Sequence, residues 1–115
     1  MFGFESLSIY KRARNYNLQI RSLLRQNKID YPSENQLRRA ALSVQLNIAE
    51  GNSRFSPKDI RHFYVISRSS LHECVAVLDI LHEEKTIENN IFYSVKNESE
   101  EISKILFKMI SGLSN

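Results

Sequence analysis

The chain of 115 residues has ordinary globular proportions, with 42% hydrophobic and 25% charged residues and a formal net charge of +3. This length is enough for one hydrophobic core and too short for two, which predicts a single domain over residues 1–115. The composition excludes a membrane span, because no window approaches roughly 18 consecutive apolar residues, and the N-terminus shows no signal-peptide pattern. We therefore expect a cytoplasmic protein without membrane contact.

Helix-start signals divide the chain into four predicted helices. Ser33 and Gln36 have the form of a capping box, and Ser56 precedes Pro57, which suits the first position of a helix. Thr86 is the expected cap of the last helix. The loops between them are short, as consecutive antiparallel neighbours require, so the expected fold class is an all-α, antiparallel up-and-down four-helix bundle. The expected helices cover about 5–27, 33–53, 57–84 and 87–112.

The first predicted helix carries an apolar stripe on one side and a basic ridge on the other. Residues 1–28 hold six Lys or Arg and one acid, whereas a solvent face usually interleaves the two signs. At 100° per residue, the apolar side chains share one third of the circumference. They are Ile9, Ala13, Tyr16, Ile20, Leu23 and Leu24. The basic ridge on the far side consists of Lys11, Arg14, Arg21, Arg25 and Lys28.

The second and third predicted helices have more apolar surface than one core seam needs. The core seam of the second helix is Leu37, Ala40, Ala41, Val44 and Ile48. Its opposite side carries Leu42 and Leu46 together with Arg39, Ser43 and Glu50. In the third helix the core residues are Ile60, Phe63, Tyr64, Leu71, Val75, Leu78 and Leu81, and the opposite side carries Val65, Ala76 and Ile80 beside His62, Ser69 and Glu73. Because contiguous apolar patches usually mark interaction surfaces, self-association is expected.

In the last predicted helix, apolar residues recur at alternating spacings of three and four, with Glu98 as an interruption, which is the pattern of bundle packing. The expected seam is Ile91, Val95, Ile102, Ile105 and Met109. Gly51, near the end of the second helix, is expected to close that helix or to allow the close approach of another backbone.

Arg39 and Glu50 point the same way from the second helix, but they lie about 16 Å apart along its axis. Each therefore needs another partner. Glu73 of the third helix is one candidate for Arg39, an acid of a second subunit is another, and an ordinary solvated pair is the third.

No constellation of residues predicts a catalytic centre, a metal site or a cofactor. His62, His72 and His82 are ten residues apart, so they point in different directions from one helix and cannot share an ion. The lone cysteine, Cys74, lies near the core face and is expected to be a buried thiol in a reducing compartment. A ribonuclease of the HEPN type is disfavoured, because Arg68 and His72 have three residues between them where that family has four to six. The expected function is therefore non-enzymatic.

The basic ridge is compatible with three interpretations. It can be the solvated face of an amphipathic helix, a surface for sequence-independent contact with RNA or another nucleic acid, or a dock for an acidic protein. An anionic membrane is a poorer fit, because the opposite face of the helix is needed for the core.

Three segments carry a resemblance to a known family. The run QLRRAALSVQLNIAEG at 36–51 is followed by Arg54, by Ser56 and Lys58, and by ISRSSLHE at 66–73, and the chain opens with FESLSIYKRA at 4–13. These motifs resemble the four-helix bundle proteins named for reading frames inside intervening sequences of bacterial 23S ribosomal RNA genes. The match covers roughly residues 4–84, and the last helix fits by pattern alone.

The resemblance implies a subunit of a homopentameric ring, similar to the accessory protein of diversity-generating retroelements, which partners a reverse transcriptase. It implies no enzymatic activity. The family positions that it carries over have an expected role in packing and subunit contact: Arg39, Asn47, Glu50, Gly51, Ser70 and Glu73. The leading hypothesis is a pentamer that binds RNA through the basic ridge. A protein-binding scaffold, or an accessory subunit of a nucleic-acid enzyme, is the alternative.

Overall fold

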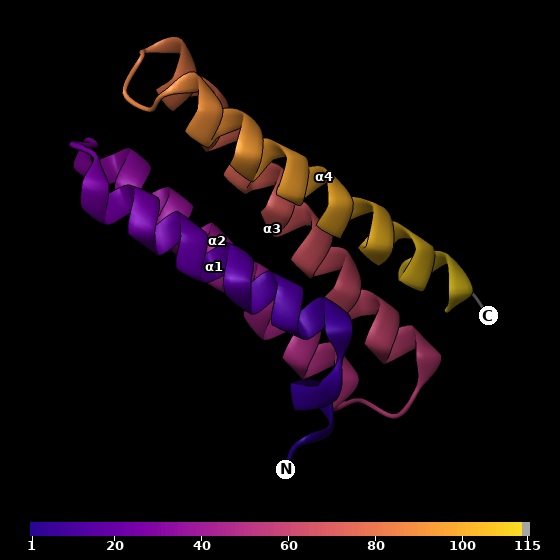
Figure 1. Ribbon diagram of the computed structural model, residues 1–115. Coiled ribbons are helices and arrows are strands. Elements are labelled where there is room, and N and C mark those ends of the chain that lie inside the picture. Colours follow the sequence, from indigo (N-terminus) through magenta and orange to yellow (C-terminus); the bar gives the residue numbers. More distant parts are fainter. Residues whose placement is uncertain (114–115) are drawn as a thin grey trace.

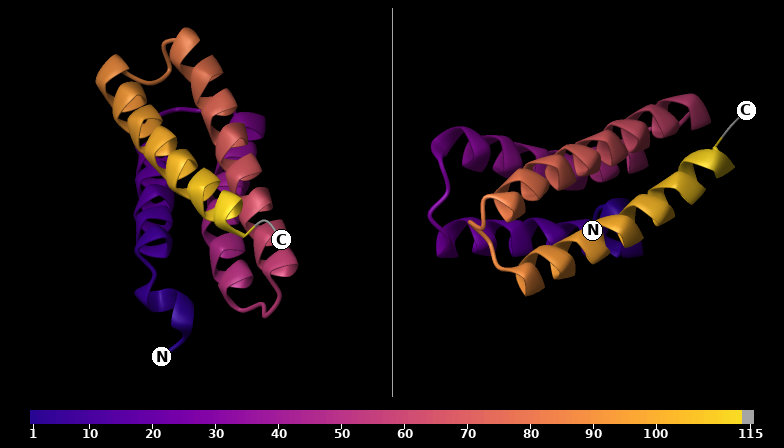
Figure 2. Two further views of the ribbon diagram at one scale, coloured as in Figure 1. Left: turned by 90° about the vertical axis from the view of Figure 1, so that its right-hand side faces the viewer. Right: turned by 90° about the horizontal axis from the view of Figure 1, so that it is seen from above.

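The computed structural model describes residues 1–113, in which four α-helices follow a short 3-10 helix (Figure 1). The elements are η1 (Gly3–Ser6), α1 (Ser8–Gln26), α2 (Tyr31–Asn52), α3 (Pro57–Glu83) and α4 (Asn89–Gly112). Each helix packs against its two neighbours around the bundle, and α2 and α3 have the most extensive contact. Successive helices run antiparallel (Figure 2). The predicted all-α four-helix bundle is confirmed.

The start of the chain differs from the single helix expected from residue 5. Gly3–Ser6 form the separate 3-10 helix η1, and Leu7 has extended backbone angles before α1 begins. The carboxylate of Glu5 accepts a hydrogen bond of 2.6 Å from the backbone N–H of Phe2. This contact caps the N-terminal end of η1, and the extended Leu7 separates η1 from α1.

The second helix begins before the serine that was expected to cap it. Asp30 is the N-cap, and its carboxylate accepts a hydrogen bond of 3.0 Å from the backbone N–H of Ser33. That bond lowers the pKa of Asp30. The prediction of Ser33 as the cap is wrong because Pro32 fits within the first turn of a helix, so the helix can start at Tyr31. For α3 the prediction is confirmed, since Ser56 Oγ accepts from the N–H of Asp59 at 3.1 Å.

Thr86 does not cap the last helix. It instead completes the end of α3, where Lys85 has a positive φ of 61°. The N–H of Thr86 donates to the carbonyl of Leu81 (2.9 Å), and the N–H of Lys85 donates to that of His82 (3.0 Å). This is the Schellman pattern, with lysine in the left-handed position that glycine usually occupies. Ile87, in the connection that follows, is buried, and α4 begins at Asn89.

The predicted core faces of α1 and α2 are buried in full. In α3, Tyr64, Leu71, Leu78 and Leu81 are buried, while Ile60, Phe63 and Val75 are half-buried. The predicted seam of α4 is partly wrong, because Ile91, Ile105 and Met109 are only half-buried. Its buried face consists of Phe92, Val95, Ser99, Ile102, Leu106 and Ile110.

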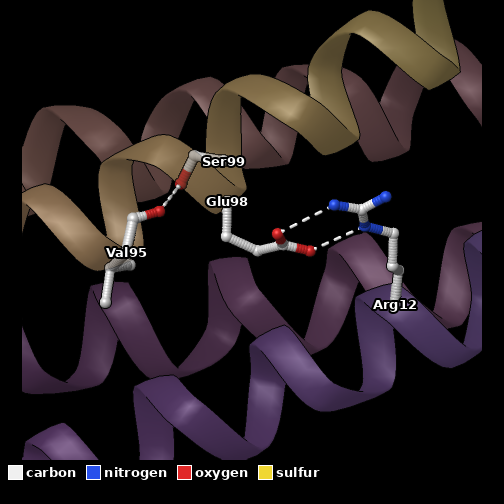
Figure 3. Close-up of polar contacts among 4 residues, drawn as sticks. All are labelled: Arg12, Val95, Glu98 and Ser99. Carbon is white, nitrogen blue, oxygen red and sulfur yellow. Dashed lines mark hydrogen bonds and ion pairs between the residues drawn. The ribbon is translucent and has the colours of Figure 1, made fainter.

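The buried face of α4 differs from the predicted seam because it includes a serine. Ser99 is 1% exposed, and its Oγ donates to the carbonyl of Val95 at 2.8 Å and lies 2.9 Å from the hydroxyl oxygen of Tyr16. Figure 3 shows Ser99 turned toward Val95, while the adjacent Glu98 points to Arg12 of α1. A hydrogen-bonded serine therefore takes a core position that an apolar pattern cannot reveal.

The predicted burial of Cys74 is confirmed, and it has a consequence for stability at high pH. Burial raises the pKa of the thiol from an ordinary 9.0 to about 12. The folded state thus keeps a proton that the unfolded state loses, and this contribution to stability is present below about pH 9 and lost as pH rises toward 12.

We expect the free energy of unfolding to decrease between about pH 9 and 12, with Cys74 contributing up to about 1.4 kcal/mol per pH unit. Urea unfolding of the wild type and of Cys74→Ala across this range measures the effect. The decrease should be shallower in the variant, and equal slopes would contradict the prediction.

Candidate nucleic-acid interface and oligomer surface

The basic ridge lies on the side of α1 that faces away from the core. Lys11, Arg14, Arg25 and Lys28 are exposed, and Arg21 is half-buried. Within residues 1–113, none of the five forms an ion pair with a carboxylate. The nearest polar contact is from Arg21 Nε to Asn17 Oδ1, at 3.4 Å. The ridge is therefore a row of cations whose charges are open to a partner.

Arg12 differs from the ridge although it belongs to the same helix. Its guanidinium faces α4 and donates two hydrogen bonds to Glu98, from Nε at 2.9 Å and from Nη2 at 3.1 Å (Figure 3). The hydrogen bond to Glu98 raises the pKa of Arg12. This cation ties α1 to α4 and is already satisfied within the chain.

Leu18 is a member of this surface that the charge pattern missed. It lies between Arg14 and Arg21 at helical spacing, and 57% of its side chain is exposed. The signal was present in the sequence, because position 18 falls on the same side of the helix as the ridge. The ridge therefore combines cations with an apolar contact point near its middle.

The second candidate surface is the outer face of α2, here defined as Arg39, Leu42, Leu46 and Glu50. Leu46 is 52% exposed, Arg39 and Glu50 are exposed, and Leu42 is half-buried. On α3, Val65, Ala76 and Ile80 are also exposed. In a single chain, these apolar side chains face water as the sequence predicted.

Of the three candidate interpretations of Arg39, the structure excludes the pairing with Glu73 within the chain. Glu73 accepts a hydrogen bond from the side-chain amide of Gln36, and Arg39 has no ion pair among residues 1–113. Glu50 pairs at 2.7 Å with Arg54, one turn further along. Arg39 is left as a cation without a carboxylate partner, two helical turns before the exposed Leu46.

Two of the family motif positions, Asn47 on α2 and Ser70 on α3, lie at the contact between those two helices. Ser43 was expected on the outer face of α2, but its hydroxyl lies 2.8 Å from that of Ser70 on α3. The amide of Asn47 donates to the carbonyl and to the hydroxyl of Ser43, both at 2.9 Å. These residues join α2 to α3 inside one subunit.

Gly51 lies within α2 and does not end it, since the helix continues to Asn52. A Cβ at Gly51 would lie 2.7 Å from Cε1 of Tyr64 and 3.2 Å from Cβ of Phe63. The close neighbour is therefore an aromatic ring of α3 rather than another backbone. Only glycine allows that ring to pack against the helix without displacement.

The histidines and Arg68 are on α3 and belong neither to the basic ridge of α1 nor to the outer face of α2. Arg68 donates from Nε to the carbonyl of Ser103 at 3.3 Å and lies over the ring of Phe107, while His72 is exposed beside the open groove between α3 and α4. His82 stacks on Phe92 with a centroid separation of 4.0 Å. Among residues 1–113, no three His, Cys, Asp or Glu side chains are grouped closely enough to hold a metal ion.

The bundle and its outward cations define the class of the protein as a small four-helix bundle with a one-signed basic ridge on its first helix. The sequence profile of the family described as 23S rRNA-intervening sequence protein matches residues 5–108, and the chain belongs to this family. No curated protein matches the chain. None of the helices in residues 1–113 has the length and hydropathy of a membrane span.

A crystal structure of a protein of unknown function from the S23 ribosomal protein family of Bacteroides thetaiotaomicron has a similar fold. The two chains share 22% sequence identity with a TM-score of 0.85, and the similarity covers 89% of this chain and 97% of the other. At this identity the likeness establishes the fold alone.

Proposed function

We propose that the protein is a non-enzymatic homopentamer of the 23S rRNA intervening-sequence family that binds RNA through the basic ridge of α1. The observation that carries this proposal is the row of exposed cations without carboxylate partners. Lys and Arg that neutralise phosphates release condensed counterions, which gives sequence-independent and salt-dependent binding. Repetition of the ridge on each subunit multiplies this effect.

The proposed assembly is supported by the outer face of α2. Exposed apolar side chains on adjacent helices suit burial against a second copy, and the unpaired Arg39 suits contact with an acid of that copy. A closed ring is the form that a repeated head-to-tail contact takes when its rotation closes.

The test of the proposed function is a reversal of three ridge charges, Arg14→Glu, Arg21→Glu and Arg25→Glu, in one variant. We expect RNA affinity to fall and the slope of log affinity against log salt to become shallower by about 2, since each lost phosphate contact removes about 0.7 to 0.9. Fluorescence anisotropy with labelled RNA at several salt concentrations measures both quantities.

A matched control reverses the same number of charges away from the ridge, at the exposed Lys85, Lys104 and Lys108. Its RNA affinity should stay much closer to that of the wild type. An equal loss in both variants would make the effect one of net charge and would overturn the ridge as the binding site. A wild type that binds no RNA at low salt, but captures one acidic protein through the ridge, would favour the scaffold alternative.

A further inference from the structure

Two of the strongly exposed aromatic side chains lie at opposite ends of the bundle. Tyr31, 74% exposed, opens α2 three residues after Lys28, the last cation of the basic ridge. Phe55, 100% exposed, lies in the loop between α2 and α3. This loop is at the end of the bundle where α1 begins (Figure 1), and Gly3 of η1 lies close to Asn52, the last residue of α2. The two rings thus lie near the two ends of the ridge.

Phe55 is surrounded in sequence by cations. Arg54 precedes it, and Lys58 and Arg61 follow in the first turns of α3. Arg54 is held by its ion pair with Glu50 and by the ring of Phe63, 4.6 Å from its guanidinium carbon. Lys58 and Arg61 are exposed and form no ion pair within residues 1–113. The loop therefore presents a ring to solvent, and two cations without carboxylate partners follow it three and six residues later in the chain.

An exposed aromatic ring near cations can stack on a nucleic-acid base, provided that the base is not already stacked in a duplex. Single-stranded nucleic acid is bound by cations that follow its backbone and by aromatic side chains on which its bases stack. A protein partner usually requires its aromatic anchors within a packed apolar patch. Here the two rings lie at opposite ends of the bundle, separated along its axis by roughly the length of α1, about 28 Å, and the cations of the basic ridge are spread over that length of α1.

Given the proposed function, we propose that the RNA is single-stranded and that Tyr31 and Phe55 stack on its bases. The basic ridge, together with Lys58 and Arg61, holds the phosphates. Leu18 supplies an apolar contact to the strand near the middle of the ridge. A duplex, whose bases stay stacked, can use the cations but not the two rings.

The experiment compares a labelled 20-nucleotide oligouridine with a labelled 20-base-pair RNA duplex, using the full chain with both Tyr31→Ala and Phe55→Ala. We expect affinity for oligouridine to fall by about tenfold or more. Affinity for the duplex should change by less than about twofold, because the cations are intact. Replacement by other aromatics, Tyr31→Phe and Phe55→Tyr, should preserve the affinity for oligouridine.

The matched control is Phe107→Ala. Phe107 is 58% exposed, but it lies on α4 under Arg68 of α3, away from the ridge. Neither affinity should change in this variant, and circular dichroism checks that all variants keep their helices.

The outcomes separate this inference from the proposed function. An oligouridine affinity that is unchanged by the loss of both rings, but is lost on reversal of the ridge charges, overturns the stacking role and leaves RNA binding by the ridge intact. A similar loss for oligouridine and duplex also overturns it. A wild type that binds neither RNA at low salt overturns both proposals.

Discussion

Leu46→Glu is expected to convert the proposed pentamer into monomers while its helix content stays unchanged. Leu46 is 52% exposed at the centre of the outer face of α2, so a glutamate there is solvated in the monomer and costs less than about 0.5 kcal/mol of folding stability. In an apolar interface the same carboxylate is buried without a partner, which costs several kcal/mol per subunit contact. Light scattering after size-exclusion chromatography measures the mass, for which the proposed pentamer predicts five times 13.4 kDa.

Leu18→Glu is the matched control for this change. Leu18 has nearly the same exposure, 57%, but it lies on α1 within the basic ridge, so the same substitution should leave the mass unaltered. Arg39→Glu gives an independent test of the same face, because it replaces the cation that is proposed to meet an acid of the second copy and should also weaken assembly. A wild-type monomer, or an assembly indifferent to both Leu46→Glu and Arg39→Glu, would overturn the proposed interface.

The parts of the fold that follow from local periodicity could be predicted from the sequence. The core faces of α1 and α2 repeat apolar side chains at helical spacing, and every one of those residues is buried. The register of α4 could not be predicted in the same way. Ser99 is in the core because the carbonyl of Val95 and the hydroxyl of Tyr16 satisfy it, and the second of these partners is 83 residues away.

In the candidate surfaces, too, some features follow from local helical periodicity and others depend on residues that are distant in the sequence. The position of the basic ridge on the far side of α1 follows from 100° per residue, and the exposure of its members agrees with it. The partners of individual charges depend on which long side chains meet after packing. Glu73 therefore contacts Gln36 instead of Arg39, and Arg12 forms an ion pair with Glu98 whereas the five cations of the ridge have no carboxylate partner within residues 1–113.

Tyr16→Ala is expected to lower the free energy of unfolding by about 3 to 5 kcal/mol, the range for removing a buried aromatic side chain. Tyr16 is 0% exposed, and its ring fills the centre of the bundle while its hydroxyl lies beside Ser99. This is a large share of the roughly 5 to 15 kcal/mol that stabilises a domain of this kind. Urea unfolding followed by circular dichroism measures the loss.

Tyr16→Phe distinguishes how much of the lost free energy of unfolding comes from the ring and how much from the hydroxyl. It keeps the packing volume and removes the contacts that the hydroxyl makes with Ser99 and with the thiol of Cys74. Ser99 retains its hydrogen bond to the carbonyl of Val95. The expected loss is therefore only about 1 kcal/mol. Equal losses in the two variants would mean that the hydroxyl, rather than the volume of the ring, dominates the centre of the bundle. In that case the polar contact between α1 and α4 would fix their alignment more strongly than the apolar packing around it.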